Sequence, residues 1–172
     1  MKLYRKKIPT IAKAVVDRLA NDGDVEILSE KREEAEKDLI AIMDEYRRRD
    51  YELRERVRDH MAKRSLPYSE QGRTRKRMAE QMGHPTGEDV ERYLTRQFLE
   101  CMLMSPNIEE VYEEDQVMHR KVIDVLRSHD VDEQAIREEA MAKVKNVQEG
   151  TVDYEIALQK AVQDVKRSKD LI

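Results

Sequence analysis

Apolar residues recur along the chain with the spacing of amphipathic helices, beginning within the first twenty residues. Pro9 suits a first helical turn, and the positions around it follow the i, i+3, i+4, i+7 and i+8 pattern of one buried face. These positions are Ile8, Ile11, Ala12, Val15, Val16 and Leu19. The sequence "NDGD" at 21–24 then ends the predicted helix, because Gly23 can adopt a positive φ.

The same spacing predicts helices through the rest of the chain. An apolar face that starts at Ala35 continues to Met61, either in one long helix or in two helices with a bend near Asp50. Further helices are predicted over 70–82, 86–104, 113–128, from 129–132 onward and over 152–169. Two short segments, "VEIL" at 25–28 and "IEEV" at 108–111, read as extended. The predicted fold class is all-α, an elongated multi-helix bundle of about seven to eight helices.

The two halves of the chain repeat this order of elements at an offset of 83 residues. The offset aligns apolar positions without a gap, for example Val15 with Phe98 and Leu19 with Met102. Only five aligned positions are identical, and amphipathic helices share apolar registers easily. The pattern predicts a basic helical half over 1–83 and an acidic helical half over 84–172, as two similar halves or as one continuous domain. It leaves an internal duplication open.

The composition adds a high density of charge to this picture. Charged residues make up 41% of the chain, compared with about 25% in ordinary globular proteins, and hydrophobic residues make up 39%. No apolar run reaches the roughly 18 residues that span a bilayer, and the N-terminal segment lacks the apolar stretch of a signal peptide. We therefore expect a cytoplasmic protein without a membrane partner. The single cysteine, Cys101, excludes a disulfide within the chain and is predicted to be a buried, inert thiol.

The charges are segregated along the chain. Residues 47–78 contain twelve bases and five acids, although the net charge of the whole chain is −4. Within "YRRRDYELRERVRDH" at 46–60, an acid at i−4 precedes each of four arginines, which predicts a salt-bridged, solvated helix: Arg48, Arg49, Arg54 and Arg56.

Two groups of basic residues remain as candidates for binding an anionic partner. Arg47, Tyr51, Arg54 and Arg58 fall within a helical strip about 60° wide, which combines fork-shaped donors with an aromatic ring. In "GRTRKRMAEQ", none of the four bases has an acid at i−4: Arg73, Arg75, Lys76 and Arg77. The second group is the stronger prediction, because its charge has no local partner.

Motifs of catalysis and of metal or cofactor binding are missing from the sequence. There is no Gly-rich phosphate loop, no pair of cysteines, no His-Glu-x-x-His and no Gly-x-Ser-x-Gly. No histidine has a glutamate three residues before it, so the di-iron bundle pattern also fails. We therefore predict no catalytic residue, no metal site and no small-molecule cofactor.

Three segments resemble a known protein family. They are "MKLYRKKIPTIAKAVVDRLANDGDVEI", "EEAEKDLIAIMDEYRRRD" and "VERYLTRQFLECMLMSPNIEEVYEED". They resemble a bacterial family catalogued as domain of unknown function 507, and the similarity covers nearly the whole chain. This resemblance implies a cytoplasmic bacterial protein and transfers no catalytic or binding residue to the chain.

The sequence leaves several functional hypotheses. The first is a non-enzymatic protein-interaction or adaptor module, which binds a protein partner or itself through its acidic second half or through apolar helix faces around Phe98, Met102 and Met104. Methionine-rich stripes of this kind more often belong to a core.

The alternative is nucleic-acid or ribonucleoprotein binding through the basic segment 47–78. An enzyme would need carboxylates such as Glu36 or Asp38 to meet others in three dimensions.

Overall fold

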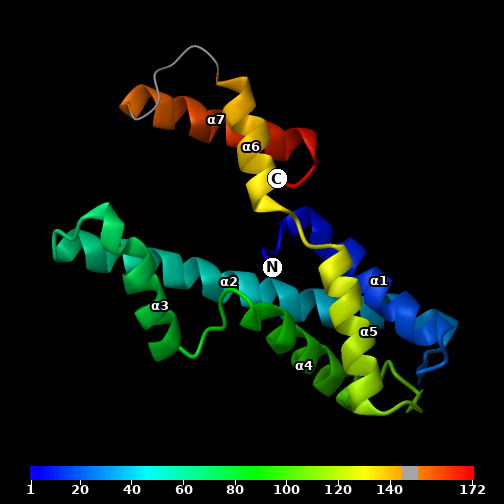
Figure 1. Cartoon of the computed structure of the whole chain (residues 1–172). Coiled ribbons are helices and arrows are strands. Elements are labelled where there is room, and N and C mark those ends of the chain that lie inside the picture. Colours follow the sequence, from blue (N-terminus) through cyan, green and yellow to red (C-terminus); the bar gives the residue numbers. More distant parts are fainter. Residues whose placement is uncertain (145–150) are drawn as a thin grey trace. The chain divides into compact units, whose positions relative to one another are not determined.

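The computed structural model describes residues 1–144 and 151–172, and it confirms the all-α class (Figure 1). Helices account for 75% of the described residues and strands for 2%. The chain forms two compact units. The larger comprises Ile8–His129 together with Met1, and the smaller comprises Lys2–Lys7 and Asp130–Ile172. In the part of the chain described, no helix is both long and apolar enough to cross a membrane.

The larger unit consists of five α-helices and two very short strands, in the described residues, with brief 3-10 turns between some of them. The elements are α1 (Ile8–Asn21), β1 (Val25–Glu26), α2 (Arg32–Lys63), α3 (Gln71–Gln81), α4 (Asp89–Met104), β2 (Glu110–Val111) and α5 (Asp115–Ser128). All six apolar residues predicted to form the buried face of the first helix are buried in α1. Gly23 ends that helix region with a φ of +78°, as predicted.

Helix α2 is a single helix of 32 residues, so the prediction of one long helix is the one confirmed. Its buried residues continue on one face from Ala35 to Val57. Asp50 is among them and is only 7% exposed. The helix is therefore uninterrupted at Asp50, and this carboxylate lies within the packed side of α2.

The two strands pair with each other, which ties the α1–α2 connection to the α4–α5 connection. Val25 pairs with Val111 and Glu26 with Glu110 in antiparallel register. Next to this pair, the buried carboxylate of Asp24 binds the ammonium group of Lys121 on α5, at 2.7 Å from Nζ to Oδ2. The segments predicted as extended are therefore strands at 25–26 and 110–111.

Four helices form the body of the larger unit. Helix α1 packs against α2, α4 packs against α5, α1 also contacts α5, and α2 also contacts α4. Helix α3 packs on the C-terminal part of α2, with Leu53, Val57 and Ala79 in a small apolar core. Elements from before and after residue 83 share this packing, and the boundary between the two compact units after α5 lies between His129 and Asp130. The two halves 1–83 and 84–172 stay a prediction.

The smaller unit is built from α6 (Glu133–Lys143), α7 (Val152–Ser168) and the N-terminal segment Lys2–Lys7. Asp132 caps α6 by accepting hydrogen bonds from two backbone amides, and Thr151 caps α7 in the same way through the amide of Tyr154. The core contains Tyr4 from the N-terminal segment, together with residues of α6, α7 and the C-terminal end: Ile136, Ala140, Tyr154, Leu158, Val165 and Leu171. Residues near both ends of the sequence thus belong to one core.

Candidate anion-binding surface

The predicted anion-binding residues all lie on the hairpin of α2 and α3, but most of their cations are already paired with carboxylates. Of the seven cations, five contact an acid: Arg47 with Asp44, Arg54 with Asp50, Arg58 with Glu55, Arg73 with Glu70 and Arg75 with Asp50. The Arg47 and Arg73 pairs are long, at 3.9 and 3.3 Å. Tyr51 is 61% exposed on the same side of α2.

The ion pairs predicted along α2 differ from those that form. Of the four predicted i−4 pairs, only the one between Asp50 and Arg54 is present. Arg48 instead binds Glu45 and Glu52 on either side of it, because the i+3 and i+4 positions of a helix are both within reach. Glu45 and Glu52 thus form ion pairs with Arg48 rather than with Arg49 and Arg56.

Arg49 has a structural role that its sequence position does not reveal. Its guanidinium group donates hydrogen bonds to the backbone carbonyls of Met82 and Gly83, at 3.3 and 3.2 Å. These carbonyls follow the C-terminal end of α3, where backbone acceptors have no partner within the helix. Arg49 thus caps α3 and fixes it against α2.

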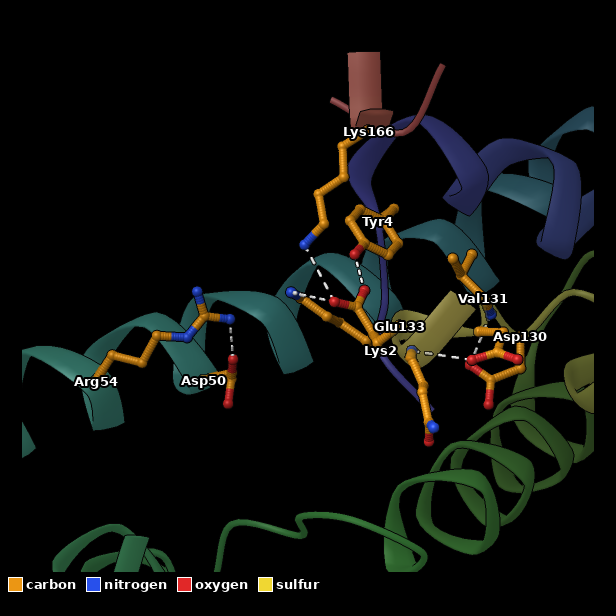
Figure 2. Close-up of polar contacts among 10 residues, drawn as sticks. Lys2, Tyr4, Asp50, Arg54, Asp130, Val131, Glu133 and Lys166 are labelled. Carbon is orange, nitrogen blue, oxygen red and sulfur yellow. Dashed lines mark hydrogen bonds and ion pairs between the residues drawn. The ribbon is translucent and has the colours of Figure 1, made fainter. Parts of the chain in front are cut away.

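Asp50 is the centre of the hairpin's charge network. It binds the guanidinium groups of Arg54, one turn away (Figure 2), and of Arg75 on α3, where Nη2 lies 2.6 Å from Oδ1. Burial alone would raise the pKa of Asp50, but Arg54, Arg75 and the neighbouring His84 outweigh it and hold the pKa below its ordinary value. Arg54 and Arg75 therefore share one carboxylate within the molecule, and their binding of an external anion stays a prediction.

Tyr46 and His84 form an aromatic pair beside this network. Their rings are stacked with centroids 4.8 Å apart, and the Tyr46 hydroxyl donates a hydrogen bond to the carbonyl of Pro85 at 3.1 Å. Burial, with a further contribution from the charge of Asp50, raises the pKa of Tyr46 to about 12. Burial likewise lowers the pKa of His84, although Asp50 partly opposes this. Both rings are thus held in their neutral forms at neutral pH.

The raised pKa of Tyr46 predicts a loss of stability at high pH. An unfolded tyrosine ionises near pH 10, so the stabilisation from keeping Tyr46 neutral is complete below about pH 10 and is lost as the pH rises towards 12. We expect Tyr46→Phe to flatten this part of the unfolding free energy curve, measured by urea denaturation between pH 9 and 12. Tyr51→Phe, the same change at an exposed ring, should keep the wild-type slope. If the unfolding free energies of Tyr46→Phe and wild type changed in parallel between pH 9 and 12, the raised pKa of Tyr46 would be contradicted.

Five exposed cations of the hairpin contact no carboxylate in the described part of the chain, and we call them the free cations. They are Arg56, Lys63 and Arg64 on or next to α2, and Lys76 and Arg77 on α3. Arg77 lies 3.1 Å from His60 Nε2, which brings its helix beside the face of α2 that carries Arg56 and Lys63. Only Lys76 and Arg77 were predicted. Arg64 could have been found, because its i−4 residue is not an acid.

The apolar face of α4 is divided between core and surface. Phe98 and Met102 are buried, at 0 and 4% exposure, which confirms that they belong to the core. Leu103 and Met104 at the end of the helix are 56 and 85% exposed. Leu103 also lines a groove of about 270 Å³ between α4 and α5, with Leu99, Gln116 and His119 among its other residues.

Cys101 and Asp38 also stood out in the sequence, and the contacts of both residues are mainly ones that stabilise the fold. Cys101 is only partly buried, so the prediction of a buried thiol is corrected, and burial followed by the charge of Asp38 raises its pKa. Asp38 accepts hydrogen bonds from the Ser105 hydroxyl at 2.7 Å and the Asn107 amide at 3.0 Å. Among the described residues, no three His, Cys, Asp or Glu side chains gather as a metal site requires.

These observations define an all-α protein with a charged α2–α3 hairpin and a partly exposed apolar end of α4. The chain belongs to the family described as "Protein of unknown function (DUF507)", whose match covers residues 1–171. This confirms the family resemblance of the three quoted segments. A comparison with curated proteins finds no match.

Proposed function

We propose that the chain is a non-enzymatic protein-interaction module and that the C-terminal end of α4 contacts the partner. The observation that carries the proposal is the exposure of Leu103 and Met104, two adjacent apolar side chains beside the groove between α4 and α5. Burying exposed apolar area contributes about 25 cal/mol per Å², so these side chains stabilise a complex if a partner or a second copy covers them.

The double substitution Leu103→Asp and Met104→Asp tests this proposal. We expect it to remove at least about 90% of the binding to a captured partner, or of self-association in sedimentation velocity, because it places charge in an apolar contact. Ile156→Asp on α7, which changes an apolar residue that is 61% exposed, is the control and should bind normally. Pull-downs with nuclease treatment separate a protein partner from one held through nucleic acid. Equal binding by the double variant and wild type would exclude this surface.

A second candidate function is binding of nucleic acid or a ribonucleoprotein through the free cations. Lys76 and Arg77 carry exposed charge that no carboxylate of the described chain neutralises, and Arg56, Lys63 and Arg64 extend the same hairpin. Cations of this kind bind phosphates and release condensed counterions, which makes the affinity fall with salt. The whole chain has more acidic than basic residues and a pI near 5.7, so we expect such binding only at the hairpin.

The test compares two double variants, each of which replaces two cations of the hairpin with glutamine. One pair of cations contacts no carboxylate, and the other pair contacts acids. We expect Lys76→Gln with Arg77→Gln to reduce affinity for an RNA or DNA oligonucleotide about tenfold and to lower the salt slope by about two, in fluorescence anisotropy. Arg47→Gln with Arg58→Gln removes the same charge from residues that contact acids and should change affinity less than about twofold. Equal losses for the two double variants, or no binding at low salt, would remove this candidate.

The internal duplication and the cellular location are also proposals. The order helix, short strand, helix occurs in α1–β1–α2 and again in α4–β2–α5. Antiparallel pairing of β1 with β2 is the arrangement expected if two such copies pair about a local two-fold axis, which supports a duplication. We further propose, from the composition and the family resemblance, that the protein is bacterial and cytoplasmic.

A further inference from the structure

The turn between α2 and α3 forms one end of the hairpin (Figure 1), and cations gather in the sequence around it. Residues 60–77 include six Lys or Arg side chains and a single acid, Glu70. Glu70 contacts Arg73 at 3.3 Å, and Arg75 contacts Asp50 on α2. Four of the five free cations therefore lie in this stretch: Lys63, Arg64, Lys76 and Arg77. The cationic charge of the hairpin that contacts no carboxylate is thus concentrated near its turn.

His60 shows that two of these cations, one from each side of the turn, lie close together. Arg77 Nη2 lies 3.1 Å from His60 Nε2, and the imidazole must be the acceptor because a guanidinium group can only donate. Desolvation, followed by the charges of Arg64 and Arg77, lowers the pKa of His60. Both guanidinium groups therefore act on one ring, and their like charges repel. A bound anion would relieve this repulsion.

Tyr68 adds an exposed aromatic ring to the same turn. The residue is 83% exposed, and its side chain has no hydrogen bond, ring contact or cation–π contact with the described residues. Four residues separate it from Arg64, a length of chain that spans at most about 14 Å. Pro67 is extended, with φ of −69° and ψ of 154°, and its carbonyl accepts a hydrogen bond from the Glu70 amide at 3.0 Å. The backbone that carries the ring is thus held in place by a closed turn.

Cations and an exposed ring together suit a single strand of nucleic acid better than a duplex. Phosphates bind the cations, and an unpaired base can stack on an aromatic side chain, because every base has a π face. In a duplex, neighbouring base pairs cover these faces. Single-strand sites span about 4–16 nucleotides, so one strand can reach both Arg64 and Tyr68. We propose, on the basis of the candidate nucleic-acid function, that this end of the hairpin binds single-stranded nucleic acid, with phosphates at Arg64 and Arg77 and a base stacked on Tyr68.

Tyr51, another exposed tyrosine of the hairpin, provides an internal control. It is 61% exposed, but it lies about 20 Å from Arg64 along α2 and about 140° away around the helix axis. The arginines on its own strip of α2 contact acids: Arg47, Arg54 and Arg58. Tyr51 therefore presents the same kind of ring without the free cations of the turn, and we expect it to make no contribution to this site.

Fluorescence anisotropy of the full chain with labelled oligonucleotides tests the proposal. The probes are single strands of RNA and of DNA, each about twelve nucleotides long, and the duplex of the same sequence. We expect Tyr68→Ala to weaken single-strand binding about tenfold and to leave duplex binding within about twofold of wild type. The salt slope should not change, because the substitution removes no charge. Tyr68→Phe, which keeps a stacking ring, and Tyr51→Ala should both bind single strands within about twofold of wild type. The stronger response, with RNA or with DNA, identifies the preferred strand.

The outcomes separate this proposal from the nucleic-acid function on which it rests. If Lys76→Gln with Arg77→Gln weakens binding but Tyr68→Ala binds single strands as tightly as wild type, the stacking site is overturned and the cationic surface stands. Equal losses of single-strand and duplex affinity in Tyr68→Ala would also overturn the stacking site. Absence of binding to every probe at low salt would remove both. Because the Tyr68 ring is exposed, Tyr68→Ala should keep the wild-type circular dichroism spectrum, so a loss of affinity reports on binding.

Discussion

Replacing Tyr4 with alanine is expected to unfold the C-terminal unit, although Tyr4 lies at the opposite end of the sequence. Its ring is 5% exposed and belongs to the core formed with α6 and α7. Removing a buried aromatic side chain costs about 3–5 kcal/mol. The unit has only roughly fifty residues, and domains of this size have little stability to lose.

The Tyr4 substitution also disrupts the polar contacts around Glu133 (Figure 2). The Tyr4 hydroxyl donates to one carboxylate oxygen of Glu133, while the ammonium groups of Lys166 and Lys2 lie 3.1 and 3.5 Å from the other. Both ammonium groups also lie over the Tyr4 ring, at 5.4 and 5.2 Å from its centroid. Alanine therefore removes a hydrogen bond and two cation–π contacts in addition to the apolar area.

Hydrogen exchange with mass spectrometry measures this effect locally. In Tyr4→Ala, amides of α6 and α7 should exchange at nearly unprotected rates, while those of α1, α2, α4 and α5 keep their protection. Tyr4→Phe keeps the ring and should lose about 1–3 kcal/mol through the missing hydrogen bond to a charged group. Tyr68→Ala removes a ring that is 83% exposed and should change stability by less than about 0.5 kcal/mol. Full protection of α6 and α7 in Tyr4→Ala would show that the N-terminal segment does not stabilise this unit.

Replacing Asp50 with alanine should destabilise the larger unit by about 2–3 kcal/mol. Breaking a fully buried ion pair costs about 3–5 kcal/mol, because a charge is left without a partner. The Asp50 side chain is 10% exposed, but the side chains of Arg54 and Arg75 are 55 and 43% exposed and can turn towards water, which reduces the cost. Urea denaturation followed by circular dichroism measures the change.

A surface ion pair provides the control for Asp50. Glu45 and Arg48 are 50 and 59% exposed, so Glu45→Gln should cost no more than about 1 kcal/mol. If Asp50→Ala cost as little as Glu45→Gln, the carboxylate would not organise the hairpin. The substitution also frees Arg54 and Arg75 from their shared acid. If the hairpin binds nucleic acid, the folded Asp50→Ala protein should therefore bind it more tightly than wild type.

The stability from Asp50 should also depend on pH in a defined direction. An unfolded aspartate has a pKa near 3.9. The pKa of Asp50 in the folded protein lies below that value. The contribution is therefore complete above about pH 4 and is lost as the pH falls through the lower pKa of the folded state. Asp50→Asn, which cannot ionise, should show a smaller loss of stability between pH 5 and 2 than wild type.

The charged surface was only partly predictable from the sequence. Ion pairs on one helix compete, so an acid at i−4 does not decide which arginine it binds, as Arg48 shows by taking both Glu45 and Glu52. Arg75 has no acid three or four residues away on its helix, yet it binds Asp50 from 25 residues away. Cations that contact a carboxylate can be told apart from the free cations only when the packing of α3 on α2 is known.

The sequence by itself determined the all-α class, the buried face of α1, the helix stop at Gly23 and the two extended segments, because these depend on local spacing and backbone freedom. The tertiary structure alone decided that β1 pairs with β2, that Arg49 caps α3, and that His84 is buried beside Tyr46. It also decided that Tyr4 completes a core with residues near the other end of the chain. Each of these contacts joins residues far apart in sequence, and their meeting depends on how whole helices pack, which the periodicity of any one segment does not encode.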